Sequence, residues 1–201
     1  TELISLTAFY KLIKNPISRI EVASAGGYLS YENIADKATV AGVEVEVRKN
    51  LFVRPLSSVA NGMNKLSFGL NGSYIYTNAK MPLATVTTGS QLEGAAPWIA
   101  NFDLSHNFTK GNHSFINTLV FNYVSDKIYT IGTQGYQDII EQGMMTLDFV
   151  SQAKLNKYVS LTLKARNLLN PSYKLSRKAN ESGEKVVLSD YKKGINISLG
   201  V

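Results

Sequence analysis

The sequence predicts an all-β protein: the wall of an antiparallel up-and-down β-barrel that spans a membrane. Apolar and polar residues alternate with a period of two along nearly the whole chain, in segments of about ten residues. The connections between these segments are of unequal length, as in barrels of the bacterial outer membrane. No apolar run reaches the roughly 18 residues that a membrane-spanning helix needs, so strands are the expected spanning elements.

Nine segments carry the alternation, and each is expected to form one strand of the wall. Short breaks follow the first segment at Lys14-Asn15-Pro16, the fifth at Lys110-Gly111-Asn112 and the seventh at Asn156-Lys157. The turn after the third segment, with Pro55, Asn61 and Gly62, is of intermediate length, and long polar stretches follow the second, fourth, sixth and eighth. The nine segments are about 3–12, 17–23, 38–49, 65–77, 98–109, 113–124, 143–155, 158–168 and 191–201.

The alternation divides the wall residues between two faces. One set is expected to face a water-filled or plugged lumen: Glu44, Glu46, Arg48, Asp103, Asp148, Lys164 and Arg166. The other set is expected to face lipid: Val43, Val45, Phe102, Leu104, Leu147, Phe149, Leu161, Leu163, Ile197 and Leu199. In a soluble sandwich the apolar set would be the core instead, but the strand length and the loop asymmetry favour a membrane.

Aromatic residues gather near the predicted outer ends of the strands. Tyr74, Tyr76, Trp98 and Tyr123, with Tyr129 nearby, are interpreted as an aromatic girdle and as packing at the loop bases. Because loops on a rigid scaffold often carry function, the candidate ligand contacts lie in the long loops. These candidates are Tyr31, Glu32, Tyr136, Asp138 and Arg177.

The net charge of +6 is unevenly distributed. Ten of the 21 Lys and Arg residues lie in residues 11–19, 48–65, 109–113 and 154–158, which contain no Asp or Glu. These spans are expected to be turns on one side of the membrane. Ordinary solvated lysines are the favoured interpretation, and contact with lipid headgroups is the functional alternative. Nucleic-acid binding is not expected, because the basic residues are scattered and no RNA-binding motif occurs.

The sequence predicts no enzyme, no metal site and no cofactor. It contains no cysteine, and its two histidines, His106 and His113, lack a second ligand at metal spacing. Nucleophile, P-loop and dinucleotide motifs do not occur. Glu44 and Glu46 stand two apart on one strand face, but with Arg48 continuing the row they indicate a charged lumen rather than a catalytic pair.

Four segments, in order, resemble TonB-dependent outer-membrane receptors: Phe9–Ile17, Ala38–Glu46, Ala165–Tyr173 and Tyr191–Gly200. The third is similar to that family's N-L-F-D-x-x-Y motif, and the fourth to its terminal strand. The resemblance implies the outer membrane of a Gram-negative bacterium and uptake of a nutrient such as a metal chelate, glycan or peptide. It also implies a plugged barrel of about 22 strands.

The resemblance makes residues 1–201 the C-terminal segment of the barrel, strands fourteen to twenty-two, with the plug absent. Thr1–Ser5 reads as the inside of a strand, so we expect a longer protein; a mature chain after signal removal is the alternative. Val201 stands where the family usually ends on an aromatic residue. The implied partners are outer-membrane lipid, the rest of the barrel and its plug, TonB acting through that plug, and a surface lipoprotein.

Two other functions are compatible with the sequence. A receptor-like barrel could serve as a structural subunit of an outer-membrane complex, which the presence of a plug and a TonB-binding segment would discriminate. A small soluble ligand-binding β-barrel is the third interpretation, and it would be a monomer that needs no detergent.

Overall fold

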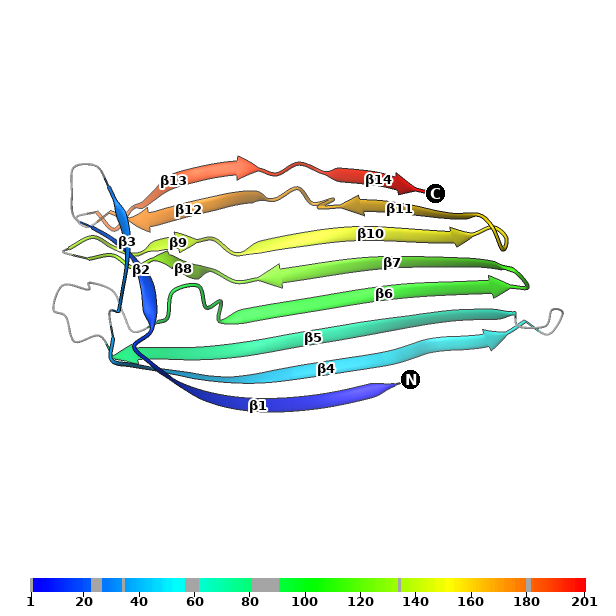
Figure 1. Ribbon diagram of the computed structural model, residues 1–201, viewed down its shortest axis with the longest axis horizontal. Coiled ribbons are helices and arrows are strands. Elements are labelled where there is room, and N and C mark those ends of the chain that lie inside the picture. Colours follow the sequence, from blue (N-terminus) through cyan, green and yellow to red (C-terminus); the bar gives the residue numbers. More distant parts are fainter. Residues whose placement is uncertain are drawn as a thin grey trace.

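The wall is one long antiparallel sheet, and smaller sheets stand at one of its ends (Figure 1). The computed structural model describes residues 2–22, 27–33, 35–56, 62–80, 91–133, 135–179 and 182–201. The long sheet has eight strands in the order β1-β4-β5-β6-β7-β10-β11-β14. Their bounds are β1 Leu3–Lys14, β4 Lys37–Pro55, β5 Met63–Lys80, β6 Trp98–Lys110, β7 His113–Val124, β10 Met144–Lys154, β11 Ser160–Arg166 and β14 Asn196–Gly200.

The smaller sheets lie beyond the long-loop end of the wall (Figure 1). One is a hairpin of β2 (Ile17–Glu21) and β3 (Leu29–Asn33). The other has the order β13-β12-β9-β8, with β8 Lys127–Thr130, β9 Ile139–Glu141, β12 Ser172–Lys178 and β13 Lys185–Lys192. We call these six strands, together with residues 91–97, the outer-loop region. No helix among the described residues is long and apolar enough to cross a membrane.

The predicted all-β antiparallel fold is confirmed, but the wall has eight strands where nine were expected. The segment predicted as the second wall strand forms β2, which pairs with β3 outside the long sheet. Asn15, before Pro16, takes a left-handed backbone conformation with φ of 46°, and its N–H donates to Asp36 O at 2.9 Å. The chain therefore leaves the sheet after β1 and returns directly beside it as β4.

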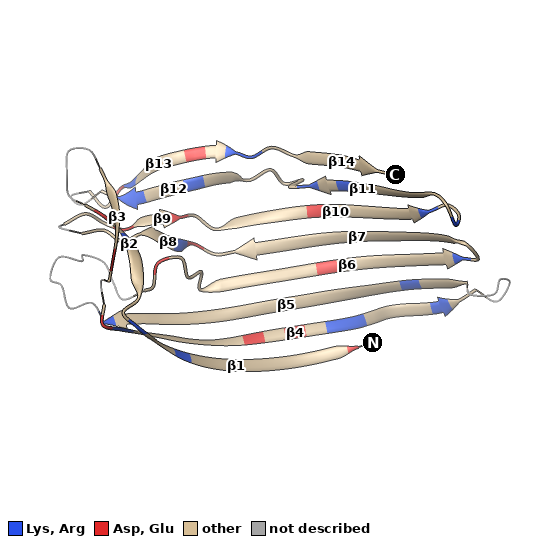
Figure 2. Ribbon diagram, in the orientation of Figure 1, with Lys and Arg blue, Asp and Glu red and all other residues tan. Residues whose placement is uncertain are grey.

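This correction changes two further expectations. The break at Lys14-Asn15-Pro16 opens a long loop rather than a short turn, so short turns follow β4, β6 and β10 and long loops follow β1, β5, β7 and β11. The basic span 11–19 consequently lies at the long-loop end, away from the other three spans (Figure 2).

The stretches expected as loops at 125–142 and 170–190 contain much of the four-stranded sheet. Asn61, which was predicted to lie in the turn after the third segment, is outside the described residues, and so is part of the loop after β5.

Cross-strand register sorts the wall residues into rows of one polarity, because residues directly opposite each other share a face. One polar row crosses six strands, and in it Asn101 Nδ2 donates to Asn71 Oδ1 at 3.3 Å and Asn122 Nδ2 to Thr146 Oγ1 at 3.2 Å. It consists of Ser5, Glu46, Asn71, Asn101, Asn122 and Thr146. The next row is on the other face: Ile4, Val47, Leu70, Phe102, Phe121 and Leu147.

The register keeps both predicted sets of wall residues together. The ten residues expected to face lipid share the face of Phe102, which we call the apolar face. The seven expected to face the lumen share the face of Asn101, the polar face. A bulge in β4 between Asn50 and Phe52 inverts the alternation of this strand, because one extra residue puts Phe52 and Arg54, rather than Leu51 and Val53, on the apolar face.

The wall is a single layer, and the buried side chains that the structure describes lie only at its long-loop end. Among the described residues, the buried apolar ones are Ile20, Ala35, Ala38, Ala79, Ala96, Ile128, Ile131 and Ile139, all at the long-loop end. On the apolar face, by contrast, Leu6 is 72% exposed and Leu199 70%. An apolar surface of this extent on one layer requires an apolar medium or a partner to cover it.

The substitution Leu147→Arg tests whether lipid is the medium that covers the apolar face. Leu147→Arg places a charge near the middle of the apolar face and should lower the free energy of unfolding by about 2–4 kcal/mol in lipid. Thr146→Arg is the matched control, at the same depth on the polar face, and should change it little. Urea unfolding in phospholipid vesicles measures both variants. Equal losses from the two substitutions would contradict the separation of the faces.

Candidate functional site

The outer-loop region is held together by contacts between segments far apart in the sequence. The hairpin strand β2 runs parallel to the segment after β8, where Ile20 and Ile131 form a bridge. Ile131 N–H donates to Arg19 O at 3.0 Å, and Glu21 N–H donates to Ile131 O at 3.3 Å. A small apolar core forms beneath this junction from Ile20, Ile128, Ile131 and Ile140.

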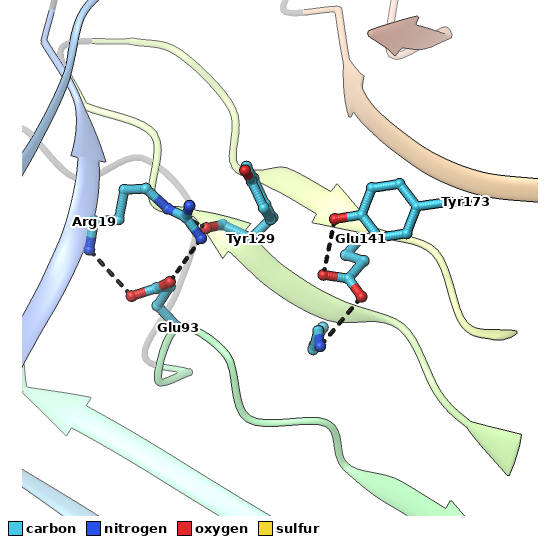
Figure 3. A network of polar contacts seen from close by, with 6 residues as sticks. Arg19, Glu93, Tyr129, Glu141 and Tyr173 are labelled. Atoms are coloured by element: carbon cyan, nitrogen blue, oxygen red, sulfur yellow. Dashed lines mark hydrogen bonds and ion pairs between the residues drawn. The ribbon is translucent and has the colours of Figure 1, made fainter. Parts of the chain in front are cut away.

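Arg19 ties three loops together (Figure 3). Its guanidinium pairs with Glu93 at 3.1 Å, while its own backbone N–H donates to the other carboxylate oxygen at 3.1 Å. Its Nε donates to Tyr129 O at 3.0 Å, and the guanidinium stacks over the Tyr129 ring at 3.8 Å. Both charged side chains are only 19% exposed, so water screens this pair less than a surface pair.

A second half-buried ion pair joins β2 to β12. Arg177 Nη2 pairs with Glu21, and both side chains are 16% exposed. The Arg177 guanidinium also lies 5.5 Å from the ring centre of Tyr136, while its buried Nε has no hydrogen-bond partner in the described part of the protein. Thr133 Oγ1 donates to the Glu21 carbonyl at 2.5 Å, which fixes the backbone of β2 beside this pair.

An open cavity of about 430 Å³ adjoins Arg177. Its lining includes Asp138, Arg177, Lys178 and Lys185, so groups of both charges reach it. Asp138 is oriented by the N–H of Gly132, which donates to its carboxylate at 2.8 Å. The cavity is therefore a recess of mixed polarity between the β7–β10 and β11–β14 connections, and its charged groups suit a ligand that both donates and accepts hydrogen bonds.

Three of the five candidate ligand contacts meet at this place. Asp138 and Arg177 line the cavity, and Tyr136 packs against Arg177. Tyr31 and Glu32 do not join them, because they lie on β3, where Tyr31 is 67% exposed. The role of all five as ligand contacts stays a prediction.

Sequence reasoning singled out Arg177 but missed Arg19, Glu21 and Glu93, and it missed both ion pairs. Glu93 lies 74 positions from Arg19, and Glu21 lies 156 positions from Arg177. No local pattern marks such pairs, because each charge alone looks like an ordinary solvated loop residue. Tyr129, interpreted as girdle or loop-base packing, lies on β8 beneath the Arg19 guanidinium.

The remaining aromatic residues keep the expected arrangement. Tyr74 and Trp98 are directly opposite each other on β5 and β6, with ring centres 4.5 Å apart. Tyr76 and Tyr123 share their face, and all four lie toward the long-loop end of the wall. Aromatic rings at this level are typical of the boundary between lipid and water in outer-membrane barrels.

A hydrogen-bonded tyrosine lies farther along the four-stranded sheet (Figure 3). Tyr173 Oη donates to Glu141 Oε2 at 3.3 Å, and Lys127 pairs with the same carboxylate at 3.2 Å. Burial, followed by the Glu141 charge, raises the pKa of Tyr173 to about 12. Within the described residues, no group of three or more His, Asp or Glu side chains is placed to hold a metal ion.

Three features define the class of protein: the wall is a single layer, its two faces differ in polarity, and its long loops contact one another. This is one side of a transmembrane β-barrel with an ordered outer end. The family model described as "TonB dependent receptor-like, beta-barrel" matches residues 1–168, and the chain belongs to this family. Searches of curated proteins and of solved structures gave no match. The family comprises transporters of the Gram-negative outer membrane rather than enzymes, and its members work with TonB.

The raised pKa of Tyr173 predicts a pH dependence. The fold favours the neutral phenol, so this contribution to stability is complete below pH 10 and is lost as the pH rises through about 12. We expect the near-ultraviolet difference titration of wild type minus Tyr173→Phe to have its midpoint near pH 12. A midpoint at the ordinary tyrosine value, about pH 10, would contradict the contact with Glu141.

Proposed function

We propose that this chain forms one side of the wall of a TonB-dependent transporter that takes up a nutrient across the outer membrane. The observation that carries the proposal is the single-layer sheet, whose two faces differ in polarity and whose wall has no core of its own among the described residues. Lipid would cover the apolar face, and the polar face would line the lumen. By the rule for such barrels, the long loops would be extracellular and the short turns periplasmic.

The two edges of the sheet support a larger barrel. Strands β1 and β14 stand at the ends of the strand order, so each has one edge without a partner strand. Unpaired backbone N–H and C=O groups are too costly to expose to hydrocarbon. We infer that further strands of the barrel pair with both edges, and that the completed barrel holds the plug through which TonB acts.

The outer-loop region would contribute to substrate capture. Its cavity presents Asp138 and Arg177 from two loops, and the ion pairs at Arg19 and Arg177 hold those loops in place. A preorganised site loses less conformational entropy on binding. The expected cargo is a polar nutrient such as a metal chelate, a glycan or a peptide, and a surface lipoprotein would be an additional partner at this end.

Uptake by a deletion strain tests the transport function. A strain lacking the full-length protein should lose uptake of one member of a panel of labelled iron chelates, oligosaccharides and peptides. The full-length gene should restore that uptake, and removal of TonB should abolish it. Unchanged uptake of the whole panel, with loss of an outer-membrane complex instead, would favour the structural-subunit function.

A pair of substitutions tests the cavity. Arg177→Gln removes a charge from the cavity and leaves Glu21 without its partner, so the apparent affinity for the transported substrate should fall about tenfold. Lys192→Gln, which also removes one positive charge but lies at an exposed position on β13 outside the cavity lining, is the matched control and should leave transport unchanged. The amount of folded protein in the outer membrane is measured for both. An unchanged affinity in Arg177→Gln, or an equal loss in Lys192→Gln, would contradict the assignment of the cavity.

A further inference from the structure

The apolar face of the wall carries a polar cluster near its short-turn end. Its members are Arg54 on β4, Asn64 on β5, His106 on β6, Asn117 on β7 and Ser151 on β10. Arg54 lies directly opposite Asn64, and Asn117 lies directly opposite both His106 and Ser151. Five successive strands thus each contribute one polar side chain to a face that is otherwise largely apolar. We call these five residues the short-turn cluster.

The cluster lies at the depth expected for the inner boundary of the membrane. His106 is eight positions along β6 from Trp98, or about 26 Å along the strand, which corresponds to about 20 Å of thickness at the usual tilt. The apolar band of such barrels is about 25 Å tall between its two aromatic girdles. Phe108 and Phe115, directly opposite each other in the next row, provide the second girdle.

The internal hydrogen bonds of the cluster occupy both amide oxygens and leave both amide NH₂ groups for a ligand. His106 Nε2 lies 2.8 Å from Asn64 Oδ1 and must be the donor, because an amide oxygen only accepts. Ser151 Oγ donates to Asn117 Oδ1 at 2.8 Å. Neither amide NH₂ group of Asn64 or Asn117 makes a hydrogen bond within the described part of the chain. Donors left unpaired against hydrocarbon are costly, so the cluster favours a ligand that offers acceptors.

The charge of this end favours an anion. Residues 48–67, 104–119 and 149–163 contain seven Lys and Arg residues and no Asp or Glu, and the basic segments at the short-turn end of the wall are visible in Figure 2. At this end the Glu2 carboxylate accepts the Asn50 N–H at 3.3 Å. Arg54 has no ion-pair partner among the described residues and packs 5.5 Å from the ring centre of Phe52.

We propose that the short-turn cluster binds the phosphodiester headgroup of an anionic phospholipid in the leaflet that the short turns face. Arg54 supplies the charge, and the amide groups of Asn64 and Asn117 donate to the phosphate oxygens. The acyl chains then lie along the apolar rows above, beside Leu104 and Leu119. This inference rests on the proposed function for one point, that the apolar face meets lipid.

The test uses the full-length protein in a neutral detergent with phosphatidylglycerol or phosphatidylcholine as the added lipid. Native mass spectrometry counts the lipids retained, and the thermal unfolding midpoint reports their stabilising effect. The variants are Asn64→Leu, Asn117→Leu and Arg54→Gln; leucine has a similar size and suits a lipid-facing surface, so folding is expected. Asn107→Leu is the matched control, one residue from His106 but on the polar face.

Wild type should retain phosphatidylglycerol in preference to phosphatidylcholine, and each variant should bind it about tenfold more weakly, as expected for a lost hydrogen bond to a charged group. Asn107→Leu should bind like wild type. No preference in wild type, or unchanged binding in all three variants, would overturn the proposal. Displacement of the lipid by millimolar inorganic phosphate would also overturn it, in favour of a free-anion site. Substrate uptake is measured separately. Transport that continues in any of these cases would leave the proposed function unaffected.

Discussion

The structure depends on one constraint: a wall one strand thick must satisfy every backbone hydrogen bond sideways, because it has no second layer to pack against. Each interior strand of the long sheet is paired with a neighbour on both sides, with a register shift at the bulge in β4. The side chains are then free to serve two different media, one on each face. The polar row through Asn71 and Asn101 and the apolar row through Leu70 and Phe102 are adjacent, yet they belong to opposite surfaces.

The same constraint explains where the compact structure is found. A side chain of the wall can be buried only by residues that do not belong to the sheet. The described residues therefore form small apolar cores only at the end where loops fold over one another. At that end, beside the small apolar cores, Arg19 and Arg177 form half-buried ion pairs between loops. Such pairs position the loops through specific geometry. This allows a rigid wall to carry a polar cavity whose lining comes from separate connections.

Sequence reasoning predicted most of the wall, because a period of two is a local signal that each strand carries by itself. It was wrong at Ile17–Glu21, since this short stretch alternates like a wall strand but follows Asn15 and Pro16, which turn the chain out of the sheet. It also interpreted β8, β9, β12 and β13 as loop. These strands form two hairpins, β8–β9 and β12–β13, and they become one sheet only because β9 pairs with β12 from another connection. The pairing of Arg19 with Glu93 was beyond prediction for the same reason. Asp138 and Arg177 were chosen only as polar loop residues, and tertiary structure brought them together.

The central claim is that adjacent wall residues face different media, and labelling of single cysteines tests it most directly. This chain contains no cysteine, so Phe102→Cys and Asn101→Cys can each be labelled with a fluorophore in a full-length protein freed of other cysteines. We expect quenching by brominated lipid at position 102 and by aqueous iodide at position 101. The reverse pattern, or iodide quenching at both positions, would contradict the assignment of the two faces.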